Sequence, residues 1–193
     1  MRRKTFDQIV TVIGFGLGIF LLIAAGLLNW GATFAESAVS DQLQAQQITI
    51  PAATGNSEET ADVTQFFTDN GDLIMSTSKQ AQMYADHYLG FHLSKMPTYA
   101  EASTASRAAN AALAGNPTDP TLISDVASKT AALDTAFKGT VLKGTLLTAY
   151  AFGTLGGIAG ISALVSLAGG AFMLLLSVLG LLHIRRTSDD ATI

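Results

Sequence analysis

The sequence predicts an all-α membrane protein with two transmembrane helices and a small helical domain between them. Two stretches without any charged residue, 9–30 and 144–182, are each long enough to cross the hydrocarbon core, which needs about 20 apolar residues. The composition agrees, because 49% of the residues are hydrophobic and 13% are charged, about half the ~25% usual in soluble proteins. The chain has no cysteine, which excludes disulfides and thiolate metal sites.

The first span is predicted at residues 9–30, after a cytoplasmic N-terminus at residues 1–8 that holds three basic side chains. Basic flanks favour the cytoplasmic side, and an indole such as that of Trp30 prefers the membrane interface. A cleaved signal peptide is the alternative, with residues 33–35 as the cleavage site. The apolar run exceeds the ~7–15 residues of a signal sequence, so we expect an uncleaved anchor.

The second uncharged stretch is longer than one span needs. As a helix, residues 144–182 would be roughly 60 Å long, so they form either a hairpin of two short spans or one span with an outer extension. The basic pair at 185–186 follows directly, and a single crossing leaves both basic ends in the cytoplasm. We therefore place the second span at residues 162–184, an apolar outer helix segment at 144–161, and a cytoplasmic tail at 185–193.

Residues 31–143 are predicted to form the extracytoplasmic helical domain. Residues 36–47 continue the first helix, and residues 48–51 are extended, because a proline at position 51 disfavours helix at the residue before it. Residues 53–62 have the composition of a loop.

A helix of this domain is expected after Thr77, which forms a capping box with Gln80, and it ends near Lys95. Two of its aromatic residues lie on one helical face and a third lies beside them, so we predict a groove there. The residues predicted to line this outer groove are Tyr84, Tyr88 and Phe91.

Two further helices complete the predicted outer bundle. The alanine-rich stretch 98–113 is the first, and the second begins at Pro120, which suits a first-turn position, and extends to about Phe137. Gly139 is expected to break the chain before the apolar segment 144–161.

His87 and His92 are the candidate metal ligands, with Asp86 and Glu101 as the nearest acids. Two histidines five residues apart on an α-helix point in different directions, unlike an i, i+4 pair. The third histidine, His183, belongs to the opposite side of the membrane in the predicted topology. We therefore expect no metal and no cofactor, and interpret both histidines as residues of an amphipathic helix.

Small residues recur at four-residue spacing along the spans and the outer segment, which is typical of membrane helices that pack closely. The predicted helix-packing residues are Gly14, Gly18, Ala149, Gly153, Gly157, Gly160, Ser162, Ser166 and Gly170. We expect them to contact the helices of a partner, with part of the surface used by the two spans packing on each other. The glycines near position 16 do not fit a phosphate loop, because no strand precedes them.

The sequence disfavours several classes of function. Neither span has an ionisable residue in its interior, whereas proton relays and ion paths normally need such groups. The acidic middle of the chain has no basic footprint for nucleic acid. No nucleophile with a recognisable base and no pair of suitably spaced acids stands out, so the chain is not expected to be an enzyme.

Short blocks scattered over nearly the whole length are similar to a known family. The blocks are residues 1–7 (MRRKTFD), 27–32 (LLNWGA), 42–43, 46–48, 80–86 (QAQMYAD), 97–101 (PTYAE) and 144–152 (GTLLTAYAF). They resemble a family of small actinobacterial two-span membrane proteins, often named as aromatic ring-opening dioxygenases. The histidines argue against that activity, since a non-haem iron site needs two histidines and a carboxylate in facial geometry.

The size and topology also resemble the small accessory proteins of the actinobacterial cytochrome bc1–aa3 respiratory supercomplex. This resemblance implies a non-catalytic accessory subunit for assembly or stabilisation, with cytochrome bc1 and aa3 subunits and membrane lipids as partners. The protein would lie in the plasma membrane with both termini cytoplasmic. The alternative is a cell-envelope scaffold or sensor that binds a lipid or wall component through its outer domain.

Overall fold

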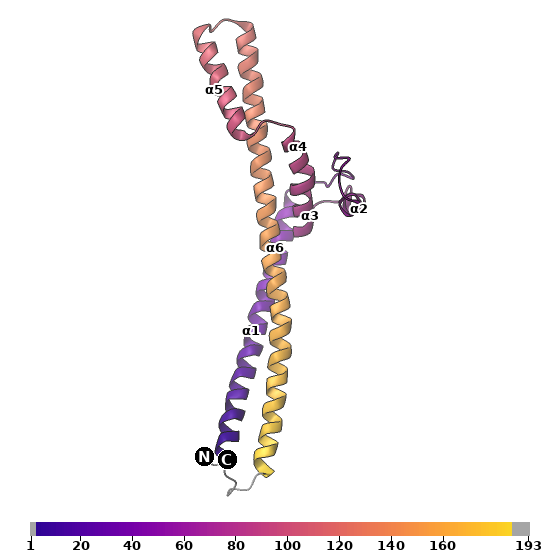
Figure 1. The fold of residues 1–193 in the computed structure, drawn as a ribbon, viewed down its shortest axis with the longest axis vertical. Helices are drawn as coiled ribbons and strands as arrows, with labels where there is room; N and C mark the ends of the chain where they lie inside the picture. Colours follow the sequence, from indigo (N-terminus) through magenta and orange to yellow (C-terminus); the bar gives the residue numbers. More distant parts are fainter. Residues whose placement is uncertain (1–2, 187–193) are drawn as a thin grey trace. The chain divides into compact units, whose positions relative to one another are not determined.

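The computed structural model describes residues 3–186, which are helical along most of their length (Figure 1). The helices are α1 (Arg3–Ala45), α2 (Ala61–Asn70), α3 (Ser78–Met83), the π-helix η1 (Tyr84–Leu89), α4 (Gly90–Ser94), α5 (Tyr99–Gly115) and α6 (Pro120–Arg186). Among these residues the β pairing is limited to an isolated bridge between Thr49 and Ile74. The all-α prediction is confirmed, while residues 1–2 and most of the predicted tail, 187–193, lie outside the described range.

The chain divides into two compact units, and each is described by itself. The span unit comprises Met1–Ser37 and Thr154–Ile193, and the middle unit is Ala38–Gly153. Both α1 and α6 are long and apolar enough to cross a membrane. The described chain therefore has two candidate membrane spans, as predicted.

Helix α6 extends without interruption for 67 residues, so the predicted end near Phe137 and the predicted break at Gly139 are wrong. Gly139 is instead a point of close approach, because a Cβ added there would lie 2.6 Å from Leu93 Cδ2. A glycine inside a helix costs about 1 kcal/mol relative to alanine, which tertiary packing readily offsets. Residues 144–161 and 162–184 consequently belong to one continuous helix.

Helix α2 was not predicted, although it supplies part of the middle unit's core. Its residues Val63 and Phe67 are buried, and Phe67 has no exposed surface. The buried apolar residues of this core are Val39, Leu43, Ile50, Val63, Phe67, Met75, Ala81, Met83, Ala85 and Leu146. They come from several helices and from the extended segments beside α2, so the core joins parts that are distant in the sequence.

The extended segment predicted at residues 48–51 is confirmed. Ile50 N donates to Leu73 O at 3.0 Å, and Met75 N donates to the carbonyl of Ile48 at 2.8 Å. These bonds satisfy backbone groups that would otherwise be buried without a partner. They hold the segment before α2 (residues 48–50) against the segment after it (residues 73–75).

Two capping boxes define the helix starts in the middle unit. The predicted box at Thr77 and Gln80 is present, and a second one joins Thr98 to Glu101 at the start of α5. Each box satisfies backbone N–H groups that the first turn leaves unpaired. The predicted helix limits near Lys95 and at residues 98–113 agree with α4 and α5 to within two residues.

Helix α5 lies beside the first part of α6 in the middle unit (Figure 1). The ring centroids of Tyr99 and Phe137 are 6.0 Å apart. Small residues on α5 are buried, namely Ala102, Ser106 and Ala109. Their size allows the two helices to approach closely, which explains the alanine-rich composition of this stretch.

Candidate functional site

Small residues bring the two helices of the span unit together. A Cβ added at Gly14 would lie 2.5 Å from Ser177 Oγ, and one added at Gly18 would lie 2.8 Å from Leu174 Cδ2. A Cβ at Gly170 would lie 3.0 Å from the carbonyl oxygen of Gly18. Glycine thus lets the backbones approach, and this approach gives membrane helices their van der Waals contacts.

These contacts define an antiparallel register between α1 and α6 in the span unit (Figure 1). The neighbouring pairs are Asp7 with His183, Thr11 with Gly180, Gly14 with Ser177, Gly18 with Gly170, Ala32 with Gly160, and Ala35 with Gly156. Residues 9–30, predicted as the first span, therefore lie beside residues 162–184, predicted as the second. The two predicted spans are distant in the sequence, and the packing of α1 on α6 places them side by side.

The remaining predicted helix-packing residues have other surroundings. Ala149 packs against the core of the middle unit, and a Cβ at Gly153 would clash with the side chain of Ser78. A Cβ at Gly157 would meet no other element within 4 Å. Two further predicted residues, Ser162 and Ser166, are half-buried. Much of the surface predicted to contact a partner is thus occupied inside the chain, and Gly157 is left open.

The residues of the predicted outer groove form ring contacts along η1 and α4. The ring centroids of Tyr84 and Tyr88 are 4.9 Å apart, and those of Tyr88 and His92 are 4.4 Å apart. Phe91 packs edge-on against His92, and Lys95 Nζ lies 5.0 Å from the Phe91 ring centroid. Burial and, secondarily, the neighbouring Tyr88 raise the pKa of Tyr84. These contacts give the aromatic residues a packing role, and their part in a ligand groove stays a prediction.

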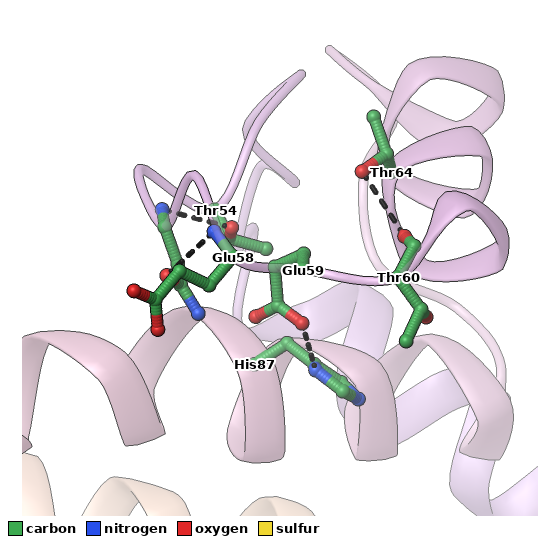
Figure 2. A network of polar contacts seen from close by, with 7 residues as sticks. Thr54, Glu58, Glu59, Thr60, Thr64 and His87 are labelled. Atoms are coloured by element: carbon green, nitrogen blue, oxygen red, sulfur yellow. Dashed lines mark hydrogen bonds and ion pairs between the residues drawn. The ribbon is translucent and has the colours of Figure 1, made fainter.

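An acid from the loop before α2 holds His87 (Figure 2). The distance from His87 Nδ1 to Glu59 Oε2 is 3.0 Å, and the Glu59 side chain is only 12% exposed. The loop is stabilised by its own bonds, since Asn56 N donates to Thr54 Oγ1 and Glu58 N donates to Asn56 Oδ1, both at 3.1 Å. The His87–Glu59 pair therefore fastens this loop to η1.

The candidate metal ligands do not converge. His92 Nδ1 lies 2.8 Å from the carbonyl oxygen four residues before it, whereas His87 faces the loop, Glu101 caps α5 and Asp86 is exposed. Within residues 3–186, no group of three or more His, Asp or Glu side chains could hold a metal ion. The sequence predicts a regular α-helix here, but Tyr84–Leu89 is π-helical.

The middle unit contains an apolar groove that the sequence analysis did not predict. It lies between the C-terminal part of α1 and the part of α6 within this unit, and its volume is about 560 Å³. Its lining includes the buried residues Val39, Leu43 and Leu146, the exposed residues Phe137, Val141 and Phe152, and the polar residues Gln42, Gln46, Lys138, Thr145 and Thr148. An open surface of this composition is suited to binding an apolar segment.

The α6 side of the groove follows a spacing that is visible in the sequence. Its residues at positions 137, 141, 145, 148 and 152 are separated by four, four, three and four residues. Residues at this spacing lie along one face of a helix. The predicted break at Gly139 divides this pattern between two elements, whereas the continuous helix α6 unites it.

No protein-family model, no characterised protein and no solved structure matches the chain. The resemblance to small actinobacterial two-span proteins consequently stays a prediction. Any function must therefore be proposed from the sequence and the structure themselves.

Proposed function

We propose that this protein is a non-catalytic accessory subunit that docks on a larger plasma-membrane complex through the groove of its middle unit. The supporting observation is the groove itself, which has a volume of about 560 Å³ and is flanked by the exposed residues Phe137, Val141 and Phe152. Contiguous exposed apolar surface of this kind usually marks an interaction site. Polar groups in the lining suit a protein partner, because interfaces combine an apolar centre with hydrogen-bonding groups.

A helix of the partner is the segment that we propose for the groove. Both walls are themselves helical, and the α6 wall repeats at the three- and four-residue spacing of faces that accept another helix. The partner's apolar side chains would cover Phe137, Val141 and Phe152, while Gln42 in α1 and Gln46 in the turn that follows it offer hydrogen bonds on the opposite side. This arrangement would remove the exposed apolar surface from water.

The proposed topology has both termini in the cytoplasm and the middle unit outside. Basic residues at the two helix ends support it, because α1 begins with Arg3 and Lys4 and α6 ends with Arg185 and Arg186. Basic residues next to a span favour the cytoplasmic side. The antiparallel register is consistent with this topology, since Asp7 and His183 lie together near those ends.

The cytochrome bc1–aa3 respiratory supercomplex is the first candidate for the larger complex. The sequence blocks, the size of the chain and its two-span topology are the grounds for this candidate. The structure supports the more general proposal that a protein with two candidate spans docks on a partner through its groove. The experiment is therefore designed to test the two statements separately.

Purification of a tagged copy from native membranes in mild detergent tests the proposal. We expect stoichiometric recovery of other integral membrane proteins, together with the haem spectra of cytochromes bc1 and aa3. Val141→Asp places a charge in the groove and should reduce recovery about tenfold or more, because an unpaired charge in an interface is costly. Ile123→Asp is the matched control, since both residues lie in α6 and are 50% exposed while Val141 lines the groove.

Each outcome of this experiment is informative. Equal recovery with the two variants would contradict docking through the groove. Recovery with integral membrane proteins but without haem would keep the accessory role and reject the respiratory supercomplex. Recovery of the protein alone, with a bound lipid or wall component, would favour the alternative of a cell-envelope scaffold or sensor.

A further inference from the structure

We propose that the span unit binds an anionic phospholipid where α1 begins and α6 ends. A pocket of about 430 Å³ lies between the two helices at this end. Its lining includes Phe6, Asp7, Val10, Leu176, Leu179 and His183. One acyl chain occupies the pocket, and the headgroup phosphate lies against Arg3 and Arg186. The inference requires only that α1 and α6 cross a membrane, so it is independent of the docking groove.

The pocket exists because small residues line its inner wall. Gly14 and Gly180 lack side chains, and the side chains facing them, Ser177 and Thr11, are short and buried. These small residues leave a volume unfilled between the helices, and larger residues such as Val10 form its outer rim. A space lined mainly by apolar groups holds water poorly, whereas an acyl chain is the natural occupant of an apolar cleft that faces lipid.

Each helix places one arginine on the face that lines the pocket. On α1, Arg3 is seven residues before Val10 and four before Asp7, so it lies two turns along the same face. On α6, Arg186 is three residues after the pocket residue His183 and seven after Leu179. Residues at these spacings share a helix face. Arg3 on α1 and Arg186 on α6 thus lie beyond the pocket at the helix ends.

The charge at this end complements a phosphate. Among the described residues here, Arg3, Lys4, Arg185 and Arg186 are basic, and Asp7 is acidic. Basic pockets between membrane helices bind anionic lipid headgroups, and a basic residue near the surface strengthens binding about fivefold. The combination of an apolar pocket and a cationic mouth selects an anionic phospholipid over a zwitterionic one.

Asp7 contributes an acceptor for the headgroup. Its Oδ2 atom is buried and has no hydrogen-bond partner among the described residues, and His183 Nε2 is 4.0 Å away. That distance is too long for a hydrogen bond. Buried polar atoms are nearly always hydrogen-bonded. A headgroup that carries hydroxyls, such as that of phosphatidylglycerol, would donate to this oxygen.

Native mass spectrometry of the full-length protein in detergent, titrated with phosphatidylglycerol or phosphatidylcholine, tests the proposal. We expect the first phosphatidylglycerol to bind about tenfold more tightly than phosphatidylcholine. Arg186→Gln should weaken phosphatidylglycerol binding about fivefold, whereas Arg185→Gln, one residue away and off the pocket face, should change it less than about twofold. Filling the pocket with Val10→Trp should abolish the preference for phosphatidylglycerol, and Ile13→Trp, exposed on the same helix, should retain it.

Two results would overturn the proposal. Equal affinity for the two lipids would show that the pocket does not select an anionic headgroup. Equal losses for Arg185→Gln and Arg186→Gln would show that net charge, and not this site, attracts the lipid. Circular dichroism of each variant verifies that the helices remain folded, and co-purification of membrane proteins should be unaffected by Val10→Trp, which separates this site from the docking groove.

Discussion

The two units of this chain bury opposite kinds of side chain. In the middle unit, the fully buried residues are the large Ile50, Phe67, Met75 and Leu146. In the span unit, the buried residues include Thr11, Ala25, Ala35, Ala163 and Ser177, whereas large side chains such as Ile13, Phe20, Trp30 and Leu164 are exposed. The middle unit therefore buries large apolar groups in a core, whereas the span unit buries mainly small residues and leaves most of its large apolar groups exposed.

This difference is the one expected if the middle unit faces water and the two candidate spans face lipid. Water drives large apolar side chains into a core, as in the middle unit. In lipid no such drive operates between helices, and small residues at the contact allow close packing. The same type of substitution should therefore have a large effect where the side chain is buried and a small one where it faces outward.

The largest expected effect comes from removing one phenylalanine in each unit. Phe67→Ala should destabilise the middle unit by about 3–5 kcal/mol, because Phe67 is 0% exposed and its loss leaves a cavity. Phe20→Ala should change stability by less than about 0.5 kcal/mol, because Phe20 is 64% exposed. Urea unfolding in detergent, followed by circular dichroism, measures both. Equal losses would mean that Phe20 is packed and would weaken the contrast between the units.

A smaller effect is expected from adding a side chain to the span unit. Gly18→Leu should destabilise the helix pair by about 1–3 kcal/mol, because a Cβ there already approaches Leu174 and the Gly170 carbonyl. Gly16→Leu is the control, since a Cβ at Gly16 meets nothing within 4 Å. Both changes raise helix propensity equally, so that contribution cancels. Thermal unfolding in detergent compares them, and indistinguishable midpoints would contradict the register.

The smallest effect concerns the capping box of α5. Hydrogen bonds from the Thr98 backbone and then from its side chain lower the pKa of Glu101 below the ordinary value of 4.5. A carboxylate with a lowered folded pKa stabilises the fold above its unfolded pKa, and this contribution is lost as the pH falls through the folded value. Helicity should therefore decline slightly on acidification below pH 4.5, and Glu101→Gln should reduce that dependence. Circular dichroism at several pH values measures it, and an unchanged slope in the variant would exclude Glu101 as the cause.

The sequence was most informative about the spans because their signals are local. The absence of charge over residues 9–30 can be seen without knowing what packs beside them, and Gly14 and Gly18 lie on a face that packs against α6. The spacing could not tell which helix would be contacted. The same small-residue pattern serves packing within a chain and packing between chains.

The middle unit was harder to predict because its features depend on distant residues. The capping box at Thr77 is a local pattern and was predicted, but Gly139 was read as a break because its neighbour Leu93 is remote in the sequence. The sequence signal for helix α2 is weak, because the helical spacing of Val63 and Phe67 directly follows a loop-like stretch. The groove joins two helices separated by about a hundred residues, so neither wall alone reveals it.

The central claim is that the span unit crosses the membrane and that the middle unit lies outside. Single-cysteine labelling is its most direct test. The chain has no cysteine, so Thr5→Cys in α1 and Ala112→Cys in α5, both at exposed positions, can be labelled without background. A membrane-impermeant maleimide should label the position in α5 in intact cells and the position in α1 only after permeabilisation. Labelling of both positions, or of neither, in intact cells would contradict the account.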